Sequence, residues 1–299
     1  MKLEQLIGNT PLVELKRLNE NPGVSLYAKL EGQNPGGSVK DRAAYFMIKD
    51  ALKEGKLKHT DTLIEATSGN TGIALAMIAS LFGIKIKLVM PESATIERVQ
   101  TMRAYGAEVI LTPADGTIEY SRSYALEQAK QNGYIILDQF NNSSNKRAHY
   151  HTTGPELWRD TNGEITHFVS SMGTTGTITG SSTFLKEKNS SIQIIGAQPA
   201  EGSRIPGIRK WSPEMLPGIF EPDKVDQIEL VSREEAIEHS RLLAQREGIF
   251  AGMSSGGALA IALRIANSID EGVIVFIVCD RGDRYLSSDL FDMSIQTKV

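Results

Sequence analysis

The chain has 299 residues, of which 40% are hydrophobic and 23% charged; this is ordinary for a globular protein, and the length is a soft indication of two domains. The formal net charge of -4 provides no basic surface for nucleic acid or for an anionic membrane. Cys279 is the only cysteine, so an intrachain disulfide is excluded, and the apolar run before it predicts a strand end rather than a reactive thiol.

The N-terminal segment MKLEQLIGNTPL lacks the long apolar stretch of a signal peptide, and no run approaches the length that spans a bilayer. We therefore expect a cytoplasmic protein. The five histidines form neither HExxH nor a Cys/His pattern, so no metal site is expected. His149 and His151 are interpreted only as neighbours on a loop or at a helix start.

The segment NPGGSVKDR, residues 34–42, follows the strand-like LYAKLEG. Its proline and glycines break that strand, and Ser38 with Asp41 predicts a capping box that opens a helix over residues 43–52. Lys40 then lies in the first helical turn, where the partial positive charge of the helix disfavours an ammonium group and favours the neutral amine. Such a lysine is suited to Schiff-base formation, although a solvated surface lysine fits this stretch as well.

Apolar runs rich in Val, Ile and Leu recur along the chain, as is typical of strands buried on both faces of a parallel sheet. They are residues 62–66, 84–90, 108–111, 134–137, 167–171, 192–197 and 273–278. Helical patterns lie between them: residues 95–105 and 117–132 each end before a glycine, and Ser232 with Glu235 predicts a capping box for a helix that ends at Gly248. The alternation predicts an α/β fold with right-handed crossovers.

Two further segments bear on the organisation of the chain. The polar cluster NNSSN at residues 141–145 is turn-prone and predicts a boundary between two series of strands and helices. Residues 201–223 hold four of the eleven prolines and three glycines, so we expect an irregular segment. Such a loop is typical of a cover over a site and equally of a plain surface excursion.

Three glycine-rich turns each precede a predicted helix: TSGNTG at residues 67–72, GTTGT at 173–177 and GMSSGG at 252–257. The free N–H groups at a helix N terminus can bind an anion, although each turn alone also fits an ordinary cap. The P-loop pattern is absent, and no turn is GxGxxG with an acidic residue placed to bind a ribose. A phosphorylated cofactor that is not a nucleotide remains as the ligand of these turns. Together with a Schiff-base lysine, it indicates pyridoxal phosphate.

Four motifs in this order, NPGGSVKDRAA, EATSGNTGIALA, SSMGTTGTITG and GMSSGGALA, resemble the β-family (fold type II) of pyridoxal-phosphate enzymes and, within it, the O-acetylserine sulfhydrylases. The resemblance extends from IGNTPLV to CDRGDRYLS. The turn GTTGT, with PGIRKW and CDRGDRYLS, is similar to the B form, whereas the A form would have GTGGT. The resemblance to the family implies a fold like that of tryptophan synthase β, with two domains that each have a central, mostly parallel sheet flanked by helices. The smaller, mobile domain would be residues 35–145 and would bind the substrate carboxylate, and the larger would be residues 1–34 with 146–299 and carry the phosphate-binding turn.

The resemblance also implies roles for individual residues. Lys40 would carry the aldimine with pyridoxal 5'-phosphate and act as general base, Asn70 would bind the ring hydroxyl, and Ser254 would face the pyridine nitrogen. The phosphate would be held by Gly173, Thr174, Thr175, Gly176 and Thr177. The substrate α-carboxylate would be bound by Thr67, Ser68, Thr71 and Gln139. Arg209 would be a pocket residue that meets an anionic sulfur donor, with Lys210 as the alternative.

The implied reaction is a β-replacement that forms L-cysteine, or S-sulfocysteine, from O-acetyl-L-serine and sulfide, or thiosulfate, through bound aminoacrylate in the last step of cysteine biosynthesis. The natural donor stays open, and the family implies a homodimer. Alternatives within the fold are an A-type cysteine synthase, a cystathionine-forming enzyme and a dehydratase, although TSGNTG differs from the dehydratase-like SSGNH. A non-catalytic phosphate-binding module is a further alternative, against which the intact Lys40 argues. The C-terminal SIQTKV matches no known tail and is assigned no role.

Overall fold

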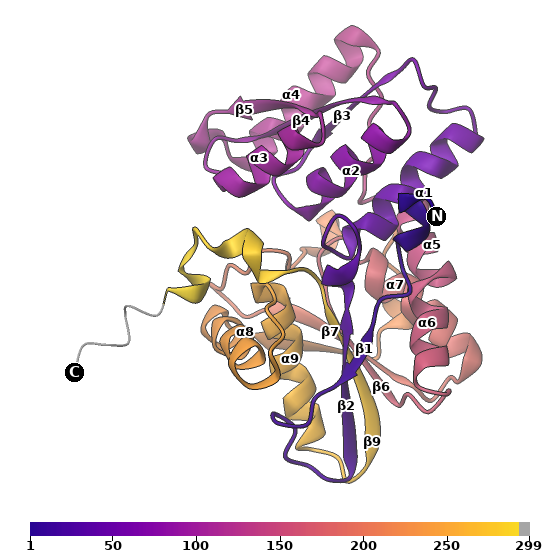
Figure 1. Cartoon of the computed structure of the whole chain (residues 1–299), viewed down its shortest axis with the longest axis vertical. Helices are drawn as coiled ribbons and strands as arrows, with labels where there is room; N and C mark the ends of the chain where they lie inside the picture. The colour runs from indigo at the N-terminus through magenta and orange to yellow at the C-terminus, as the bar shows by residue number, and fades with distance from the viewer. Residues whose placement is uncertain (293–299) are drawn as a thin grey trace, which may run out of the picture.

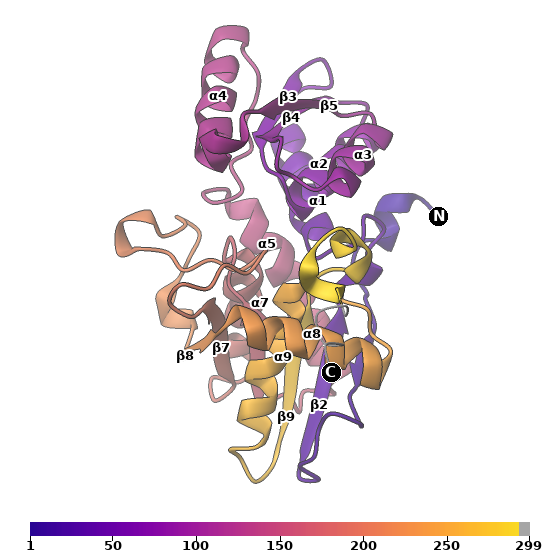
Figure 2. The same ribbon diagram turned by 90° about the vertical axis from the view of Figure 1, so that its left-hand side faces the viewer.

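The structure, a computed structural model, describes residues 1–292, which form two sheets flanked by helices (Figure 1). The C-terminal SIQTKV, to which no role was assigned, lies outside the described residues. No helix in residues 1–292 is both long enough and apolar enough to cross a membrane. Figure 2, turned by 90° from Figure 1, shows the small sheet above the large one with α1 and α5 at the level between them.

The large sheet has six strands in the order β1, β2, β9, β6, β7 and β8. Their bounds are Leu12–Glu14 (β1), Val24–Leu30 (β2), His167–Ser171 (β6), Gln193–Pro199 (β7), Gln227–Val231 (β8) and Gly272–Val278 (β9). All neighbours are parallel except β1 and β2, which are antiparallel. Strands from the two ends of the chain are neighbours in the interior of this sheet. β2 pairs with β9 from Val24 opposite Gly272 to Leu30 opposite Val278.

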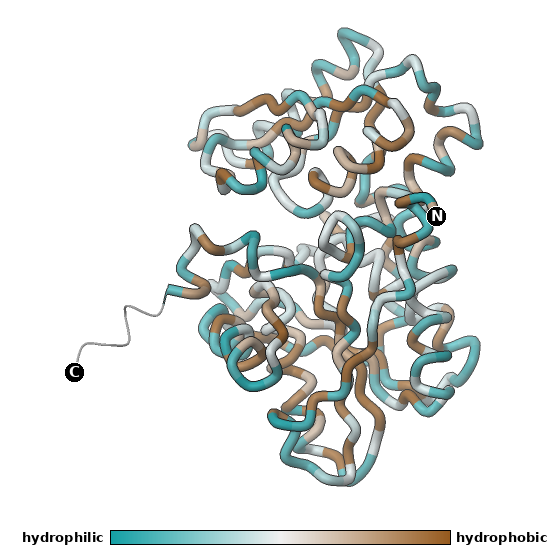
Figure 3. The backbone as a smooth tube through the Cα atoms, viewed as in Figure 1, coloured by the Kyte–Doolittle hydropathy of each residue, from teal (hydrophilic) through white to brown (hydrophobic). Residues whose placement is uncertain are grey.

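Each face of the large sheet is covered by helices, and successive side chains of a strand enter different cores. On β9, Ile274 and Phe276 belong to one apolar cluster, whereas Val275 and Ile277 belong to another. The first cluster includes residues of α8 (Arg233–Glu247) and α9 (Met253–Ala266), and the second includes residues of α6 (Thr153–Asp160) and α7 (Gly176–Lys188). Figure 3 shows hydrophobic residues along the central strands, as expected for a sheet buried on both faces.

The small sheet is entirely parallel, in the order β3, β4 and β5. Its strands are Thr62–Ala66 (β3), Lys85–Pro91 (β4) and Glu108–Thr112 (β5), and its helices are α1 (Lys40–Lys53), α2 (Asn70–Leu81), α3 (Ile96–Ala104) and α4 (Thr117–Asn132). Most of α2 is buried in a core that it shares with α1 and the three strands. The helix α5 (Ser143–His151) packs on both α1 and α7 and so links the two sheets.

The α/β class, the two mostly parallel sheets and the irregular segment after residue 200 are confirmed. The capping box of Ser232 with Glu235 is present as predicted. The strand predicted at residues 134–137 is wrong, because this run makes only a bridge between Ile135 and Leu63. Of the expected boundary at residues 141–145, residues 143–145 already form the start of α5, and His149 and His151 lie in the last turn of that helix. The bounds of the two predicted domains stay a prediction.

Candidate active site

The candidate site lies at the carboxyl ends of β6 and β9, where ligands commonly bind in α/β sheets. Here the chain before α1 meets the chain after β9, since Val39 N–H donates to the Cys279 carbonyl at 2.8 Å. The N terminus of α9 joins the same edge: Ser255 Oγ accepts from Cys279 N–H at 3.0 Å. Ser171, at the end of β6, donates to the Ser254 carbonyl at 2.7 Å.

Lys40 is the first residue of α1 and is half-buried, which agrees with the predicted position in the first helical turn. Its backbone N–H donates to Ser38 Oγ at 3.2 Å. Its amine Nζ makes no hydrogen bond or ion pair with any residue in the described part of the chain. A half-buried amine without a protein partner is available to a ligand.

The predicted capping box of Ser38 with Asp41 does not form, because Asp41 binds further back in the loop. Its Oδ2 accepts from Gly36 N–H at 2.5 Å, and a Cβ at Gly36 would lie 2.6 Å from Asp41 Oδ1. Burial raises the pKa of the Asp41 carboxyl to about 7, although the Gly36 N–H acts in the opposite direction. Glycine at position 36 thus permits the close turn that places Lys40.

Arg284 and Asp280 orient Asn70, the residue expected to meet the cofactor ring. Arg284 donates both to the Gly36 carbonyl and to Asn70 Oδ1, and Asn70 Nδ2 donates to Asp280 Oδ2 at 2.6 Å. One guanidinium therefore connects the loop before Lys40 with the first residue of α2. Sequence reasoning did not select either residue, although both lie in the segment CDRGDRYLS that contributed to the resemblance.

The turn Gly173–Thr177 leads from β6 into α7 as predicted. Thr175 has a φ of +69°, in the left-handed region, and its buried Oγ1 has no partner among residues 1–292. A threonine in this conformation is strained, and such strain is concentrated at functional sites. The glycine at position 176 is required by close packing, since a Cβ there would overlap Asn145 Oδ1.

His149 supports the end of this turn from behind. Its Nε2 lies 3.3 Å from Thr177 Oγ1, and its Nδ1 lies 2.9 Å from Thr153 Oγ1. Burial, with a smaller effect of the Arg42 charge, lowers the pKa of His149 to about 3. The imidazole is therefore neutral near pH 7, and we missed its role because an isolated histidine in a polar helix carries no distinguishing signal.

The four predicted carboxylate-binding residues lie on two neighbouring segments. Thr67, Ser68 and Thr71 surround the N terminus of α2, and Thr71 Oγ1 donates to Gln139 Oε1 at 2.7 Å. Asn145 Nδ2 donates both to the Gln139 carbonyl at 2.8 Å and to Thr174 Oγ1 at 3.1 Å. The structure thus joins the segment of Gln139 to the turn at 173–177.

Glu65 fixes the backbone that precedes Gln139. Its Oε1 accepts from Leu137 N–H at 2.6 Å and from Asp138 N–H at 2.8 Å. Burial raises the pKa of the Glu65 carboxyl to about 7, although these two N–H groups act in the opposite direction. Sequence reasoning also missed this residue, because it occupies an ordinary strand position.

Ser254 is buried in the first turn of α9, beside Gly207 in the irregular segment. Burial raises the pKa of the nearby Cys279 thiol to about 11, so the thiol is protonated at neutral pH. This agrees with the predicted strand end and disfavours a nucleophilic cysteine.

Arg209 is exposed, and its guanidinium lies 5.7 Å from the ring of Phe140 and 5.4 Å from that of Trp211. Trp211 Nε1 donates to the Gly173 carbonyl at 2.9 Å, so these rings adjoin the turn at 173–177. The structure therefore joins the segments that carry the predicted residues, with Lys40 and Asn70 on the loops that Arg284 connects and Arg209 beside the turn at 173–177.

Comparison with solved structures shows a close likeness of fold. Cysteine synthase (OASS) from Entamoeba histolytica has a TM-score of 0.92 and 37% identity, and it covers 98% of this chain and 90% of its own. An O-ureido-L-serine synthase has a TM-score of 0.91 and 36% identity, over 97% of this chain and 95% of its own.

Curated relatives and a family model agree with that likeness. Cysteine synthase B of Escherichia coli (strain K12) is 57% identical over 97% of this chain and 95% of its own length. Cysteine synthase B of Pseudomonas aeruginosa is 54% identical, over 96% of each chain. The model described as pyridoxal-phosphate dependent enzyme matches residues 3–280. This chain belongs to the family of pyridoxal-phosphate dependent enzymes.

Proposed function

We propose that this chain is a cysteine synthase that uses pyridoxal phosphate to form L-cysteine from O-acetyl-L-serine and sulfide. The observation that carries the proposal is the amine of Lys40, which has no partner within residues 1–292, together with the three glycine-rich turns that lead into the N termini of α2, α7 and α9. Relatives that are 54–57% identical over nearly the whole chain are named cysteine synthase B.

The residues of the turn at 173–177 fit the phosphate of this cofactor. The strained Thr175 has a buried hydroxyl that finds no partner in the described part of the chain, and the first turn of α7 offers N–H groups to an anion. Gly173 leaves no room for a side chain, since a Cβ there would lie 2.7 Å from the Gly207 carbonyl oxygen. We propose that Gly173, Thr174, Thr175, Gly176 and Thr177 hold the phosphate.

Bound pyridoxal phosphate withdraws electrons from the Cα of an amino acid and so makes the Cα proton removable. Lys40 Nζ would link the cofactor and would move that proton as general base and general acid. The side chain of Asn70, held by Arg284 and Asp280, keeps a second N–H on Nδ2 free to donate to the ring hydroxyl.

Two further groups would orient the substrate and set the reaction type. The hydroxyls and N–H groups of Thr67, Ser68 and Thr71, with the amide of Gln139, would bind the substrate α-carboxylate. Ser254 would present a neutral hydroxyl to the pyridine nitrogen, and because it is not a carboxylate it would not keep that nitrogen protonated. This suits replacement at Cβ rather than transamination.

The sulfur donor and the assembly are finer proposals. Arg209, stacked on Phe140 and Trp211 beside Gly173, would attract an anionic donor, which favours thiosulfate as a second donor beside sulfide. We also propose that the domain of residues 35–145 closes over bound substrate and excludes water. The enzyme would act as a homodimer, which light scattering of the purified protein tests.

Spectroscopy and kinetics test the function directly. The purified protein is expected to be yellow, to lose that colour on borohydride reduction, and to form cysteine from O-acetyl-L-serine and sulfide. Ammonia and pyruvate from serine would instead identify a dehydratase. A colourless protein that binds phosphate without turnover would support a plain binding module and contradict the proposal.

A further inference from the structure

We propose that Arg122, on α4, is a second cation of the donor site and that it acts with Arg209 to select a doubly charged sulfur donor over sulfide. The inference rests on the proposed function and deepens it, since it concerns the choice between two donors of the same reaction. It assigns a role to a residue of α4, a helix that packs on the small sheet, whereas Arg209 belongs to the irregular segment after β7.

The two guanidinium groups share one aromatic ring. Arg122 Cζ lies 5.4 Å from the centre of the Phe140 ring, and Arg209 Cζ lies 5.7 Å from the same centre. Trp211 packs edge-on against Phe140 at 5.4 Å and also contacts Arg209. Segments that are far apart in sequence thus place two positive charges around one ring, where each keeps its N–H groups for another partner.

The rings lie beside the expected places of substrate and cofactor. Phe140 directly follows Gln139, whose amide accepts from Thr71, and Trp211 is tied to the Gly173 carbonyl. The Arg209 N–H donates to the Met172 carbonyl at 2.8 Å, which fixes the segment against the end of β6. An anion held by the two arginines therefore lies next to the site where the sulfur must react.

The charges around the rings do not cancel. Neither Arg122 nor Arg209 makes an ion pair within residues 1–292, and Glu119 is the acidic group that interacts with both. The Thr117 hydroxyl, and to a lesser extent the charges of Arg209 and Arg122, lower the pKa of Glu119, so this carboxylate is ionised at neutral pH. Glu65 also interacts with Arg122, but burial raises the pKa of its carboxyl to about 7, so Glu65 is only partly ionised at neutral pH. Two cations against Glu119 and this carboxyl leave a positive site, and a dianion gains twice the attraction of hydrosulfide.

The test compares kcat/KM for thiosulfate with kcat/KM for sulfide at saturating O-acetyl-L-serine. Arg122→Gln is expected to lower the thiosulfate value by roughly five-fold and the sulfide value by about two-fold or less, as suits exposed charges. Arg122→Lys is expected to restore most of the thiosulfate value, because the charge is kept. Arg246→Gln, an exposed arginine on α8, is the matched control and should change neither value.

Glu119→Gln tests the same site in the opposite direction. Removing the competing carboxylate is expected to raise kcat/KM for thiosulfate by about two- to five-fold, and added salt should reduce this gain. Equal losses with both donors in Arg122→Gln would show that the residue only supports Phe140 and would overturn the inference. A wild-type enzyme that uses sulfide but neither uses thiosulfate nor is inhibited by it would also overturn it. Absence of turnover with sulfide in the wild type would contradict the proposed function itself.

Discussion

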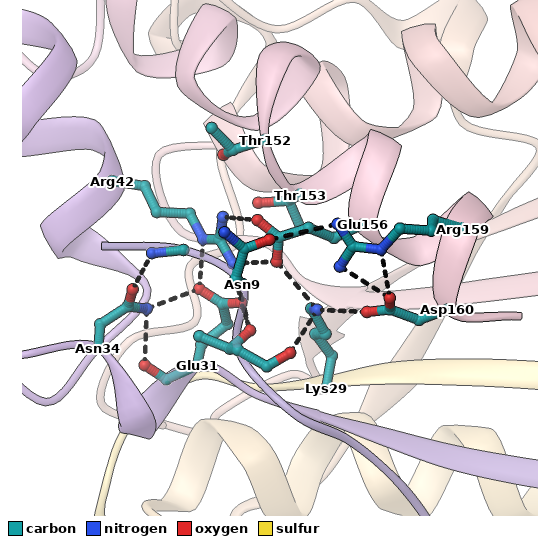
Figure 4. Close-up of polar contacts among 12 residues, drawn as sticks. Asn9, Lys29, Glu31, Asn34, Arg42, Thr152, Thr153, Glu156, Arg159 and Asp160 are labelled. Atoms are coloured by element: carbon teal, nitrogen blue, oxygen red, sulfur yellow. Dashed lines mark hydrogen bonds and ion pairs between the residues drawn. The ribbon is translucent and has the colours of Figure 1, made fainter. Parts of the chain in front are cut away.

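Two polar clusters meet at the start of α1 and differ in whether their polar groups have hydrogen-bond or ion-pair partners. The first, which we call the buried ion network, consists of Lys29, Glu31, Arg42, Glu156 and Asp160 (Figure 4). The second is the candidate active site around Lys40. In the network every charge has a partner, whereas the site contains groups that have none among the described residues 1–292. A closed cluster maintains the architecture, and an open one is ready to bind.

Arg42 is the centre of the network and is fully buried. It donates to Glu31 at 2.7 Å from both Nε and Nη2, and to Glu156 at 2.6 Å from Nη1 and 2.8 Å from Nη2. Lys29 donates to the Thr10 carbonyl at 2.6 Å and pairs with Glu156 at 2.9 Å and with Asp160 at 3.0 Å. The network therefore connects α1 with β2 and α6. Its contact on α1 is Arg42, two residues after Lys40.

The site has the opposite character. Lys40 Nζ and Thr175 Oγ1 have no partner within residues 1–292, and neither has Asp41 Oδ1. Buried polar groups without partners cost free energy in the protein alone. The contacts of the buried ion network, in which every charged group has a partner, hold α1 in place, so that Lys40 at its start can keep an amine available to a ligand. Four changes test this contrast.

The largest expected effect is on activity. Lys40→Ala should lower turnover by at least about a thousand-fold, because the base and the cofactor linkage are both lost. The free energy of unfolding of the cofactor-free chain should change by less than about 0.5 kcal/mol, since Nζ has no partner within residues 1–292 to lose. Steady-state kinetics and denaturant unfolding measure the two effects. If borohydride still fixed the chromophore to the Lys40→Ala protein, another lysine would be the anchor.

The next effect is on stability. Arg42→Met should destabilise the chain by about 3–5 kcal/mol, because Glu31 and Glu156 are left buried without their counter-charge. Guanidinium chloride unfolding measures the loss. Arg159→Met is the control: this exposed arginine pairs with Asp160, and its loss should cost less than about 1 kcal/mol. Similar losses in the two variants would remove the distinction between buried and exposed pairs.

The dependence of stability on pH should differ in sign between the clusters. Burial raises the pKa of Glu156, but Arg42 and Lys29 outweigh it and lower the pKa from 4.5 to about 2. The stability from Glu156 is therefore present above pH 4.5 and lost as the pH falls toward 2.

Asp41 behaves in the opposite way, because burial raises its pKa from 3.8 to about 7. Its contribution is present below pH 3.8 and lost as the pH rises through 7. We expect Asp41→Asn to remove the decline in unfolding free energy over that interval, as measured by denaturant unfolding at a series of pH values. A profile identical to that of the wild type would show that Asp41 does not titrate as described.

The smallest effect concerns the strained turn. Thr175→Gly should stabilise the cofactor-free chain by up to about 1 kcal/mol, because glycine accepts the φ of +69° without strain. The same change removes a hydroxyl from the proposed phosphate cradle and should weaken cofactor retention in dialysis. Thr175→Ala keeps the strain and loses the hydroxyl, so it should weaken retention as well. Undiminished retention in both variants would exclude Thr175 as a phosphate ligand.

Prediction from sequence succeeded where a local pattern carries the signal. The strands 62–66 and 167–171 were predicted to the residue, because each is a short apolar run. The helix 117–132 was also predicted to the residue, because Gly133 marks its end. It failed at Asp41, whose sequence spacing fits a cap, because Gly36 comes close enough to compete for its carboxylate. It failed again at residues 134–137, an apolar run that makes only one bridge.

The sequence by itself determined the fold class, the place of Lys40 in the first turn of a helix and the three glycine-rich turns before helices. Each of these depends on residues that are neighbours along the chain. Only the tertiary structure decided that Arg284 orients Asn70, that Asn145 links Gln139 to Thr174, and that Arg122 and Arg209 contact the same aromatic ring. The physical reason is that contacts between distant segments arise from the packing of whole elements. No spacing in the sequence records which side chains that packing brings together.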